Sequence, residues 1–407
     1  MTWIKKKLGD VLTIERGGSP RPIDKYLTNS PEGLNWIKIS DATASDKYIF
    51  ETKEKITTEG LHKTRMVREG DFILSNSMSF GRPYIMKTSG CIHDGWLVLK
   101  ENGQKIFDTE FLYYLLSSPY VFKQFDYLAA GSTVRNLNIA LVSSVEVPTP
   151  PLPEQKRIVS ILDEAFAAIA KAKANAEQNL KNAKELFESY LQGVFENKGD
   201  GWDERKVTEI GNAQTGTTPK TAERENYGDF IPFIKPADVD YLGLGDIRYD
   251  NEGLSEIGLK KGRKIESGSI LMVCIGATIG KVGFAEREVS CNQQINSLTV
   301  KKEFEPKFIY YAMTSKAFQE KVLLEGKGAQ ATLPIINKSK WENLTISFPK
   351  SKTEQQTIVR QLDALRAETQ KLEAVYQKKI DDLEELKKSI LQKAFAGELK
   401  TEKAISV

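Results

Sequence analysis

Apolar and small residues recur in alternating steps of three and four between Pro153 and Asn197. These steps place them on one face of a helix, as a heptad repeat with one irregularity near Asn179. At about 1.5 Å per residue, roughly 45 residues make a helix of about 65 Å. The pattern predicts a coiled-coil helix, with a long core helix as the alternative. The positions are Ile158, Leu162, Ala165, Ile169, Ala172, Ala176, Leu180, Ala183, Phe187, Tyr190 and Val194.

The same stretch occurs again 200 positions later without a gap. Glu154, Gln155 and Leu162 recur as Glu354, Gln355 and Leu362, and the second stripe runs from Ile358 to Ile390. Each helix can bury the apolar stripe of the other, so we expect them to pair. The predicted interface residues are Ile158, Leu162, Ile169, Leu180, Phe187, Ile358, Leu362, Leu372, Leu383 and Ile390.

The segments that precede the two helices also repeat. The first has strand-like stretches at 35–39, 71–74 and 96–100 and a predicted helix over 109–124. The second follows the same plan with diverged residues, so the chain is a tandem repeat of about 200 residues. The matched pairs are Trp3 with Trp202, Gly17-x-x-Pro20 with Gly216-x-x-Pro219, Cys91 with Cys291, and Phe111-x-Tyr113-Tyr114 with Phe308-x-Tyr310-Tyr311.

This repeat predicts an α+β protein with an internal pseudo-twofold repeat. Two mixed α/β globules are joined by a pair of long antiparallel coiled-coil helices, because the second helix must run back along the first for the stripes to meet. We expect a first globule at 1–152, a central helix at 153–198, a second globule at 199–350 and a C-terminal helix at 351–407.

Composition and net charge exclude several classes of protein. The net charge of +3 is close to neutral for 407 residues, and no run of 18 apolar residues predicts a membrane span. The N-terminus lacks the apolar core of a signal peptide, and three cysteines are too few for a disulfide framework. We therefore expect a cytoplasmic protein. Two histidines, His62 and His93, make a zinc site or a histidine-based triad unexpected, and we expect no metal.

Three stretches resemble catalytic motifs without completing them. Thr149-Pro150-Pro151-Leu152 lacks the acid or amide and the aromatic residue of an adenine methyltransferase. The run from Gly276 to Lys281 is one residue short of a phosphate loop, and Val282 stands where Ser or Thr is required. Glu385-Leu386-Lys387 matches part of a nuclease signature but lies within the heptads. We expect no catalytic residues and no cofactor.

The whole chain resembles the specificity subunits of type I restriction–modification systems. The resemblance rests on Pro148-x-Pro150-Pro151-Leu152-Pro153-Glu154-Gln155, on the ending from Leu391 to Leu399 and on Gly201-Trp202. It implies two target recognition domains that read a bipartite sequence in double-stranded DNA. It also implies partners, which are adenine-methylating modification subunits, two per chain, and restriction subunits. The second helix departs from the pattern because Phe348 to Gln355 lacks the proline cluster.

Three loops in each globule carry side chains suited to DNA. Base edges are read by Arg, Lys, Asn, Gln, Ser and Thr, and glycines allow close backbone approach. The loops are 75–82 with 275–281, 131–136 with 327–332, and the turns at 93–94 and 292–294; ordinary strand turns are the alternative. The predicted DNA-binding residues are Ser75, Asn76, Arg82, Ser132, Thr133, Arg135, Asn136, Thr278, Lys281, Gln293, Gln294, Lys327, Gln330 and Thr332.

Because the loops differ between the globules, the sequence predicts an asymmetric bipartite target. Two other functions stay open at this point: a self-contained DNA modification enzyme, and a coiled-coil scaffold that does not recognise DNA. The missing cofactor motifs argue against the enzyme. The divergence of polar loops on matched scaffolds argues against the scaffold protein, which needs no such divergence.

Overall fold

The computed structural model describes residues 3–43, 45–76, 80–130, 136–240, 245–326 and 334–399. The chain divides into two compact units, residues 1–177 with 378–407, and residues 178–377. Each unit contains one globule together with parts of both long helices.

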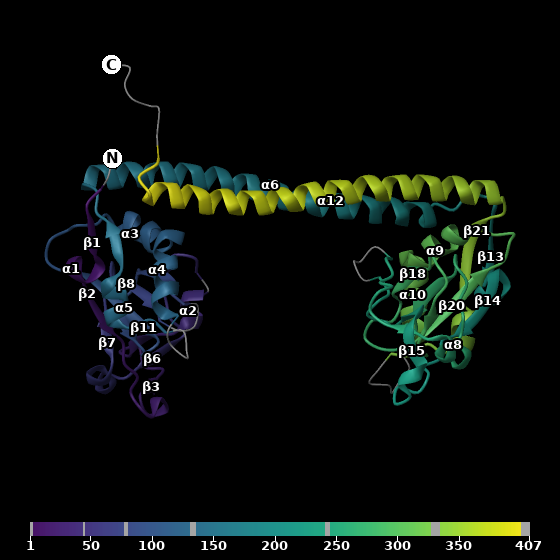
Figure 1. Ribbon diagram of the computed structural model, residues 1–407, viewed down its shortest axis with the longest axis horizontal. Helices are drawn as coiled ribbons and strands as arrows, with labels where there is room; N and C mark the ends of the chain where they lie inside the picture. The colour runs from purple at the N-terminus through teal and green to yellow at the C-terminus, as the bar shows by residue number, and fades with distance from the viewer. Residues whose placement is uncertain are drawn as a thin grey trace, which may run out of the picture. The chain divides into compact units, whose positions relative to one another are not determined.

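The long helices α6 (Leu152–Glu196) and α12 (Lys352–Phe395) are each continuous (Figure 1). They run antiparallel, since the start of α6 shares the first unit with the end of α12. There, Lys173 Nζ lies 2.5 Å from Glu384 Oε1, and Lys387 lies over the Phe166 ring. In the second unit, the Tyr190 hydroxyl is 3.3 Å from Gln361 Oε1.

The first globule has twelve strands among the described residues. Its helices are α1 (Leu8–Val11), α2 (Ile39–Thr43), α3 (Thr109–Leu116), α4 (Pro119–Ala129) and α5 (Ile139–Ser144), with 3₁₀ turns at Ile23–Lys25 and Thr58–Lys63. Its strands are β1 (Lys5–Lys7), β2 (Leu12–Arg16), β3 (Leu27–Thr28), β4 (Leu34–Ile37), β5 (Tyr48–Ile49), β6 (Glu54–Ile56), β7 (Arg65–Val67), β8 (Phe72–Ser75), β9 (Pro83–Met86), β10 (Gly90–Ile92), β11 (Trp96–Glu101) and β12 (Glu146–Pro148).

These elements form layers around a central sheet of order β2-β11-β8-β9-β5. Strand β11 is buried on both faces, so its side chains alternate between two cores. Leu97 and Leu99 pack with the helices and with Ile158 and Leu162 of α6. Trp96 and Val98 pack toward a second sheet, β3-β6-β4-β10-β7. The α6 helix is therefore part of the globule's core.

The second globule repeats this plan. Its sheets have the orders β14-β20-β17-β18, β16-β15-β19 and β13-β21. The strands are β13 (Trp202–Lys206), β14 (Gly211–Thr215), β15 (Tyr227–Ile234), β16 (Gly253–Leu254), β17 (Ile270–Val273), β18 (Val282–Phe284), β19 (Ser290–Cys291), β20 (Ile295–Val300) and β21 (Thr345–Pro349). The helices are α7 (Val207–Ile210), α8 (Glu256–Lys261), α9 (Pro306–Thr314), α10 (Lys316–Gly326) and α11 (Lys338–Glu342), with a 3₁₀ turn at Arg224–Asn226.

A buried glutamine joins each long helix to its globule in the same way. Gln155 accepts a hydrogen bond from the Asp108 amide at 2.7 Å and donates to the Pro150 carbonyl at 2.8 Å. Gln355 accepts from the Glu305 amide and donates to the Pro349 carbonyl, both at 2.8 Å. Both side chains are almost fully buried. The repeated Glu-Gln of the sequence is therefore a structural joint.

The predicted helix over 109–124 is wrong in one respect, because two helices occupy this range. The α3 helix ends at Leu116, and α4 begins at Pro119, where Ser118 accepts a hydrogen bond from the Val121 amide. A proline in a helix interior removes a hydrogen bond and clashes with the preceding turn, whereas the first turn tolerates it. The Ser118-Pro119 pair is thus the start of a second helix, α4, which the apolar periodicity alone does not indicate.

The predicted helix-pair residues differ in burial. Ile158 and Leu162 are fully buried, and Ile169 is nearly so. Leu372 is 41% exposed. Leu362 is fully buried as well. The remaining five are partly buried, namely Leu180, Phe187, Ile358, Leu383 and Ile390; Phe187 and Ile358 pack against the second globule's core and Ile390 against the first.

All three cysteines are free and buried. Burial raises the pKa of Cys91 to about 11 and those of Cys274 and Cys291 to about 12. Among the described residues, no helix is both long and apolar enough to cross a membrane. The described ranges likewise contain no group of three or more His, Cys, Asp or Glu side chains arranged to hold a metal ion.

Candidate nucleic-acid interface

Three segments of the first globule meet at Asn76, directly after β8. The Asn76 amide donates to the Gly95 carbonyl at 3.0 Å, and its side chain donates to the Asp94 carbonyl at 2.8 Å. The Asn76 carbonyl in turn accepts from the Leu137 amide at 2.8 Å. The loop after β8, the turn between β10 and β11 and the segment before α5 are therefore hydrogen-bonded together.

The second globule makes the same junction at Cys274, directly after β17. The Cys274 amide donates to the Gln294 carbonyl at 2.8 Å, and its carbonyl accepts from the Ile336 amide at 2.9 Å. Gly276 adds a bond to the Pro334 carbonyl at 3.1 Å. The backbone geometry is thus repeated, while the side chains around it are different.

A fourth segment, the repeated Gly-x-x-Pro loop, completes each junction. A Cβ atom on Gly17 would lie 2.1 Å from the His93 carbonyl oxygen, and one on Gly216 would lie 2.1 Å from that of Asn292. Only glycine allows this approach. Two residues on, Ser19 donates to Asp94 Oδ1 at 2.7 Å, and Thr218 donates to Gln293 Oε1.

The Asp94 carboxylate is the acidic group of the first junction. The hydrogen bond from Ser19 is the main cause that lowers its pKa, and Arg21, 3.5 Å away, acts in the same direction. Beside it, burial lowers the pKa of His93, whose Nδ1 accepts from the Gly95 amide at 2.9 Å. A neutral imidazole and an ionised carboxylate therefore share this turn near neutral pH. Such a carboxylate can accept a hydrogen bond from a cytosine amino group.

An open groove of about 840 Å³ lies beside this turn. Its walls include Ser19, Arg21, Trp36, Lys38 and His93. The Lys38 ammonium is paired with Glu54 from β6, and 40% of the lysine side chain is exposed. The matched lysine of the second globule, Lys235, directly follows β15 and is paired with Glu252. The groove thus combines an aromatic wall with cations and acceptors, the groups used to contact nucleic acid.

Two predicted residues of the first globule have buried side chains. Ser75 and Asn76 are at most 1% exposed, and their polar atoms bond to the Arg82 backbone and to Asp94. These side chains therefore hold the loop in place, and their predicted contact with DNA stays a prediction. Arg82 is more accessible: its guanidinium is 3.2 Å from Asp46 Oδ1 and 5.3 Å from the Tyr84 ring centre.

In the second globule, Thr278 and Gln293 are exposed, and Gln294 is half-buried. The Gln294 side chain accepts from Asn292 Nδ2 at 3.0 Å. Lys281 is half-buried and lines a cavity of about 620 Å³ together with Lys184 and Lys316. Gln293 is therefore the most accessible amide at this junction.

Seven predicted residues belong to the 131–136 and 327–332 loops. Of these, Asn136 is described: it is half-buried, and its Oδ1 has no hydrogen-bond partner among the described residues. Six lie outside the described residues, namely Ser132, Thr133, Arg135, Lys327, Gln330 and Thr332.

Sequence reasoning missed Ser19, Arg21 and Thr218. The signal was present, since the Gly-x-x-Pro motif recurs in both halves around Ser19 and Thr218. In the sequence, however, the motif indicates only the repeat and not a contact with DNA. Only the fold shows that the motif packs on the turns at Asp94 and Gln293.

Comparison with known proteins identifies the family. The profile described as "Type I restriction modification DNA specificity domain" matches residues 1–181 and again residues 199–384. The chain belongs to the type I restriction–modification DNA specificity family. It is a specificity subunit, which recognises the DNA target and is itself non-catalytic. The catalytic activities of such a complex lie in its partner subunits.

Relatives and solved structures extend over the whole chain. A putative type I restriction enzyme MjaX specificity subunit from Methanocaldococcus jannaschii is 25% identical over 98% of this chain and 94% of its own length. The HindI specificity subunit from Haemophilus influenzae is 29% identical over 37% of this chain and 32% of its own. The HsdS subunit from Thermoanaerobacter tengcongensis shares the fold, with a TM-score of 0.61, 20% identity and coverage of 98% and 97%.

A chain from a structure described as "Structural basis underlying complex assembly and conformational transition of the type I R-M system" also shares the fold. Its TM-score is 0.79, with 21% identity and 98% coverage of both chains. The predicted fold class, with two α/β globules joined by long paired helices, is confirmed.

Proposed function

We propose that this specificity subunit reads an asymmetric, two-part DNA target, one part with each globule. The recognition domains are residues 1–152 and 199–350, and the helices at 153–198 and 351–407 separate them. The junctions around Asn76 and Cys274 face the DNA, through Arg21, Arg82 and Asn136 in the first globule. Thr278, Lys281, Gln293 and Gln294 act in the second.

One observation carries this proposal. Four segments converge at the same backbone junction in both globules, yet Ser19 and Asp94 stand in one where Thr218 and Gln293 stand in the other. A carboxylate only accepts hydrogen bonds, whereas an amide both donates and accepts. Two junctions with one backbone plan and different donor patterns suit two different half-targets.

We also propose that the chain binds two modification subunits, as well as restriction subunits, and acts on DNA in the cytoplasm. A net charge of +3 leaves few uncompensated cations for phosphate contacts, so the isolated chain should bind DNA weakly. Modification subunits would add those contacts. The repeated helices offer two similar docking surfaces, and we expect sedimentation of the saturated complex to give two modification subunits per chain.

Sequencing of methylated sites in the host genome, with and without the gene, tests this function. We expect one asymmetric bipartite motif to lose its methylation when the gene is absent. Replacing residues 1–150 with the corresponding globule of a relative should then change one half of the motif and leave the other. A continuous palindrome as the modified site would contradict the proposal.

A further inference from the structure

Two attachments of the second globule to α12 lie on either side of Asp363, which itself binds Tyr311 and Lys307 of the globule. The first is an apolar root at the beginning of the helix, where Gln355 makes its two hydrogen bonds and Val359 and Leu362 enter the globule's core. This root fixes where the globule sits on the helix. A single attachment of this kind leaves rotation about it less constrained than two separated attachments do.

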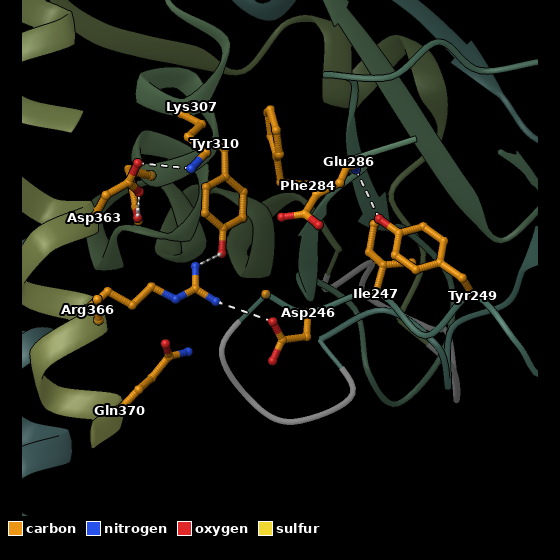
Figure 2. Close-up of a pocket in the computed structure, with 13 residues that line it drawn as sticks. Asp246, Ile247, Tyr249, Phe284, Glu286, Lys307, Tyr310, Asp363, Arg366 and Gln370 are labelled. Atoms are coloured by element: carbon orange, nitrogen blue, oxygen red, sulfur yellow. Dashed lines mark hydrogen bonds and ion pairs between the residues drawn. The ribbon is translucent and has the colours of Figure 1, made fainter. Parts of the chain in front are cut away.

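The second attachment is Arg366, three turns further along α12. Its Nη1 lies 3.4 Å from the Tyr310 hydroxyl, and its Nη2 lies 3.7 Å from Asp246 Oδ1 (Figure 2). Only 18% of the arginine side chain is exposed. At about 1.5 Å per residue, Arg366 is about 16 Å from Gln355 along the helix axis. It connects α12 to the segment between β15 and β16.

Two cavities lie beside this contact. One cavity, of about 370 Å³, is lined by Tyr249, Phe284, Arg366 and Gln370. The other, of about 620 Å³, is lined by Lys281, Thr369 and Glu373. Tyr310 and Tyr311 are walls of both. The polar contact through Arg366 therefore crosses between two cavities and braces this part of the globule against the helix.

The first unit has no corresponding ion pair at this position among its described residues. Position 166 of α6, which matches 366, is a phenylalanine that packs edge-on against Tyr114 at 5.5 Å. The segment that matches Asp246 carries Lys47 and Tyr48, which bond to Glu110 of α3. The first globule therefore has a positive charge where the second has a negative one. This positive charge pairs within the globule rather than with the long helix.

We propose that Arg366 is a positioning residue that sets the angle of the second globule on α12. It thereby fixes the number of unread base pairs that the subunit accepts between its two half-targets. The inference rests on the proposed bipartite target. With Arg366 in place, the globule is held beyond Asp363 as well as at the root, and one spacing is accepted. Without it, the angle of the globule on α12 is less constrained, and neighbouring spacings become acceptable while the bases read within each half stay the same.

The test uses the full-length chain assembled with its modification subunits. Methylation is measured on duplexes that carry both half-targets and differ only in spacer length, native or one base pair longer or shorter. We expect Arg366→Ala to reduce the preference for the native spacer by about tenfold, which corresponds to about 1.4 kcal/mol. Preferences within each half-target should be unchanged. Arg360→Ala, an exposed arginine on the same helix, is the matched control.

Exchanging the charges of Arg366 and Asp246 distinguishes a positioning role of Arg366 from a general effect on stability. Arg366→Asp alone and Asp246→Arg alone should each relax the spacer preference, and the double variant should restore it. Arg366→Gln removes the ion pair with Asp246 without truncating the side chain, so it covers the case in which Arg366→Ala does not fold, and it should also relax the spacer preference. A folded Arg366→Gln complex with the full native preference would overturn the inference. A wild-type complex that recognises no two-part target would instead overturn the proposed function.

Discussion

The hydroxyl of Tyr311 donates a hydrogen bond to Asp363 Oδ1 at 2.6 Å, which ties α9 to α12. Burial, reinforced by the bond to Asp363, raises the pKa of this tyrosine well above its usual range. The hydroxyl therefore keeps its proton and acts as a donor at neutral pH. Tyr114 and Asp163 form the same pair between α3 and α6. Each long helix is thus held to its globule by a tyrosine–aspartate bond directly after the core residue Leu162 or Leu362.

Removing this hydroxyl should destabilise the second unit. We expect Tyr311→Phe to lower the free energy of unfolding by about 1–2 kcal/mol, because a hydrogen bond to a charged group is lost. The loss stays moderate since Asp363 keeps the Lys307 ammonium at 2.9 Å. Urea unfolding followed by circular dichroism measures it. Tyr127→Phe, at a position 82% exposed, is the control, and equal stability of both variants would refute the expectation.

The buried His93 should make stability depend on pH. Its pKa is lower in the folded protein than in the unfolded chain, so the unfolded chain binds more protons between the two values. The contribution to stability is fully present above the unfolded pKa of about 6.5 and is lost as pH falls toward the folded value. Protonation at Nδ1 would also break the bond from the Gly95 amide.

We therefore expect the free energy of unfolding to fall between pH 7.5 and pH 5.5, and His93→Gln to reduce that fall. The chain has one other histidine, His62, which is exposed. His62→Gln should leave the pH dependence as it is in the wild type. Urea midpoints at the two pH values are the measurement. An identical pH dependence in wild type and His93→Gln would contradict the expectation.

Arg82 and Lys281 should each affect one half of the target. We expect Arg82→Ala to cost about 1–3 kcal/mol of binding by the assembled complex and to relax one base position in the first half. Lys281→Ala should act on the second half alone. Competition binding with single-base variants of each half measures both effects. Uniform weakening across all sequences would assign either residue to phosphate contacts, and unchanged affinity would remove it from the interface.

The fragment from Met1 to Lys198 should associate with a second copy. It keeps the first globule and α6, but it lacks Leu391, Ala394 and Phe395, which complete the core of that unit. Burying each large apolar side chain contributes roughly 1.5–3 kcal/mol, which favours a twofold antiparallel dimer. Sedimentation at several concentrations measures the association.

Two variants on the same helix test the surface involved in that dimer. Ile169 is 8% exposed in the intact chain, and an aspartate there would bury an unpaired charge. We expect Ile169→Asp to abolish the dimer while the globule stays folded. Ala170→Asp, at the exposed neighbouring position, should leave the dimer intact. A folded wild-type fragment that stays monomeric at high micromolar concentration would show that α6 does not pair through this stripe.

The fold could be predicted because its main features are periodic. The heptads and the 200-residue repeat gave the two helices and the two globules, and the strand around Trp96 was expected from its apolar run. The break at Ser118-Pro119 was missed, because apolar residues continue in helical phase across it. Leu372 was assigned to the interface from its phase on the helix, but whether a position on a stripe is covered depends on what packs against it.

Less of the candidate DNA-binding site could be predicted from the sequence. The loops were found because glycines and polar residues cluster there, and those residues are visible in the chain. Their convergence at Asn76 and Cys274 depends on backbone hydrogen bonds between segments far apart, such as Leu137 to Asn76. Burial decides which polar side chain supports a loop and which is free to meet a ligand, and it follows from the sheets rather than from residue type.

The three buried thiols make the chain convenient for site-directed labelling. Thiolates are the reactive form of cysteine, and Cys91, Cys274 and Cys291 hold their protons up to a pH of about 11 or 12. Maleimide reagents at neutral pH should therefore leave the native protein almost unmodified. A single cysteine introduced at an exposed position, such as Ala170 or Thr278, would carry a fluorophore without any native cysteine being replaced.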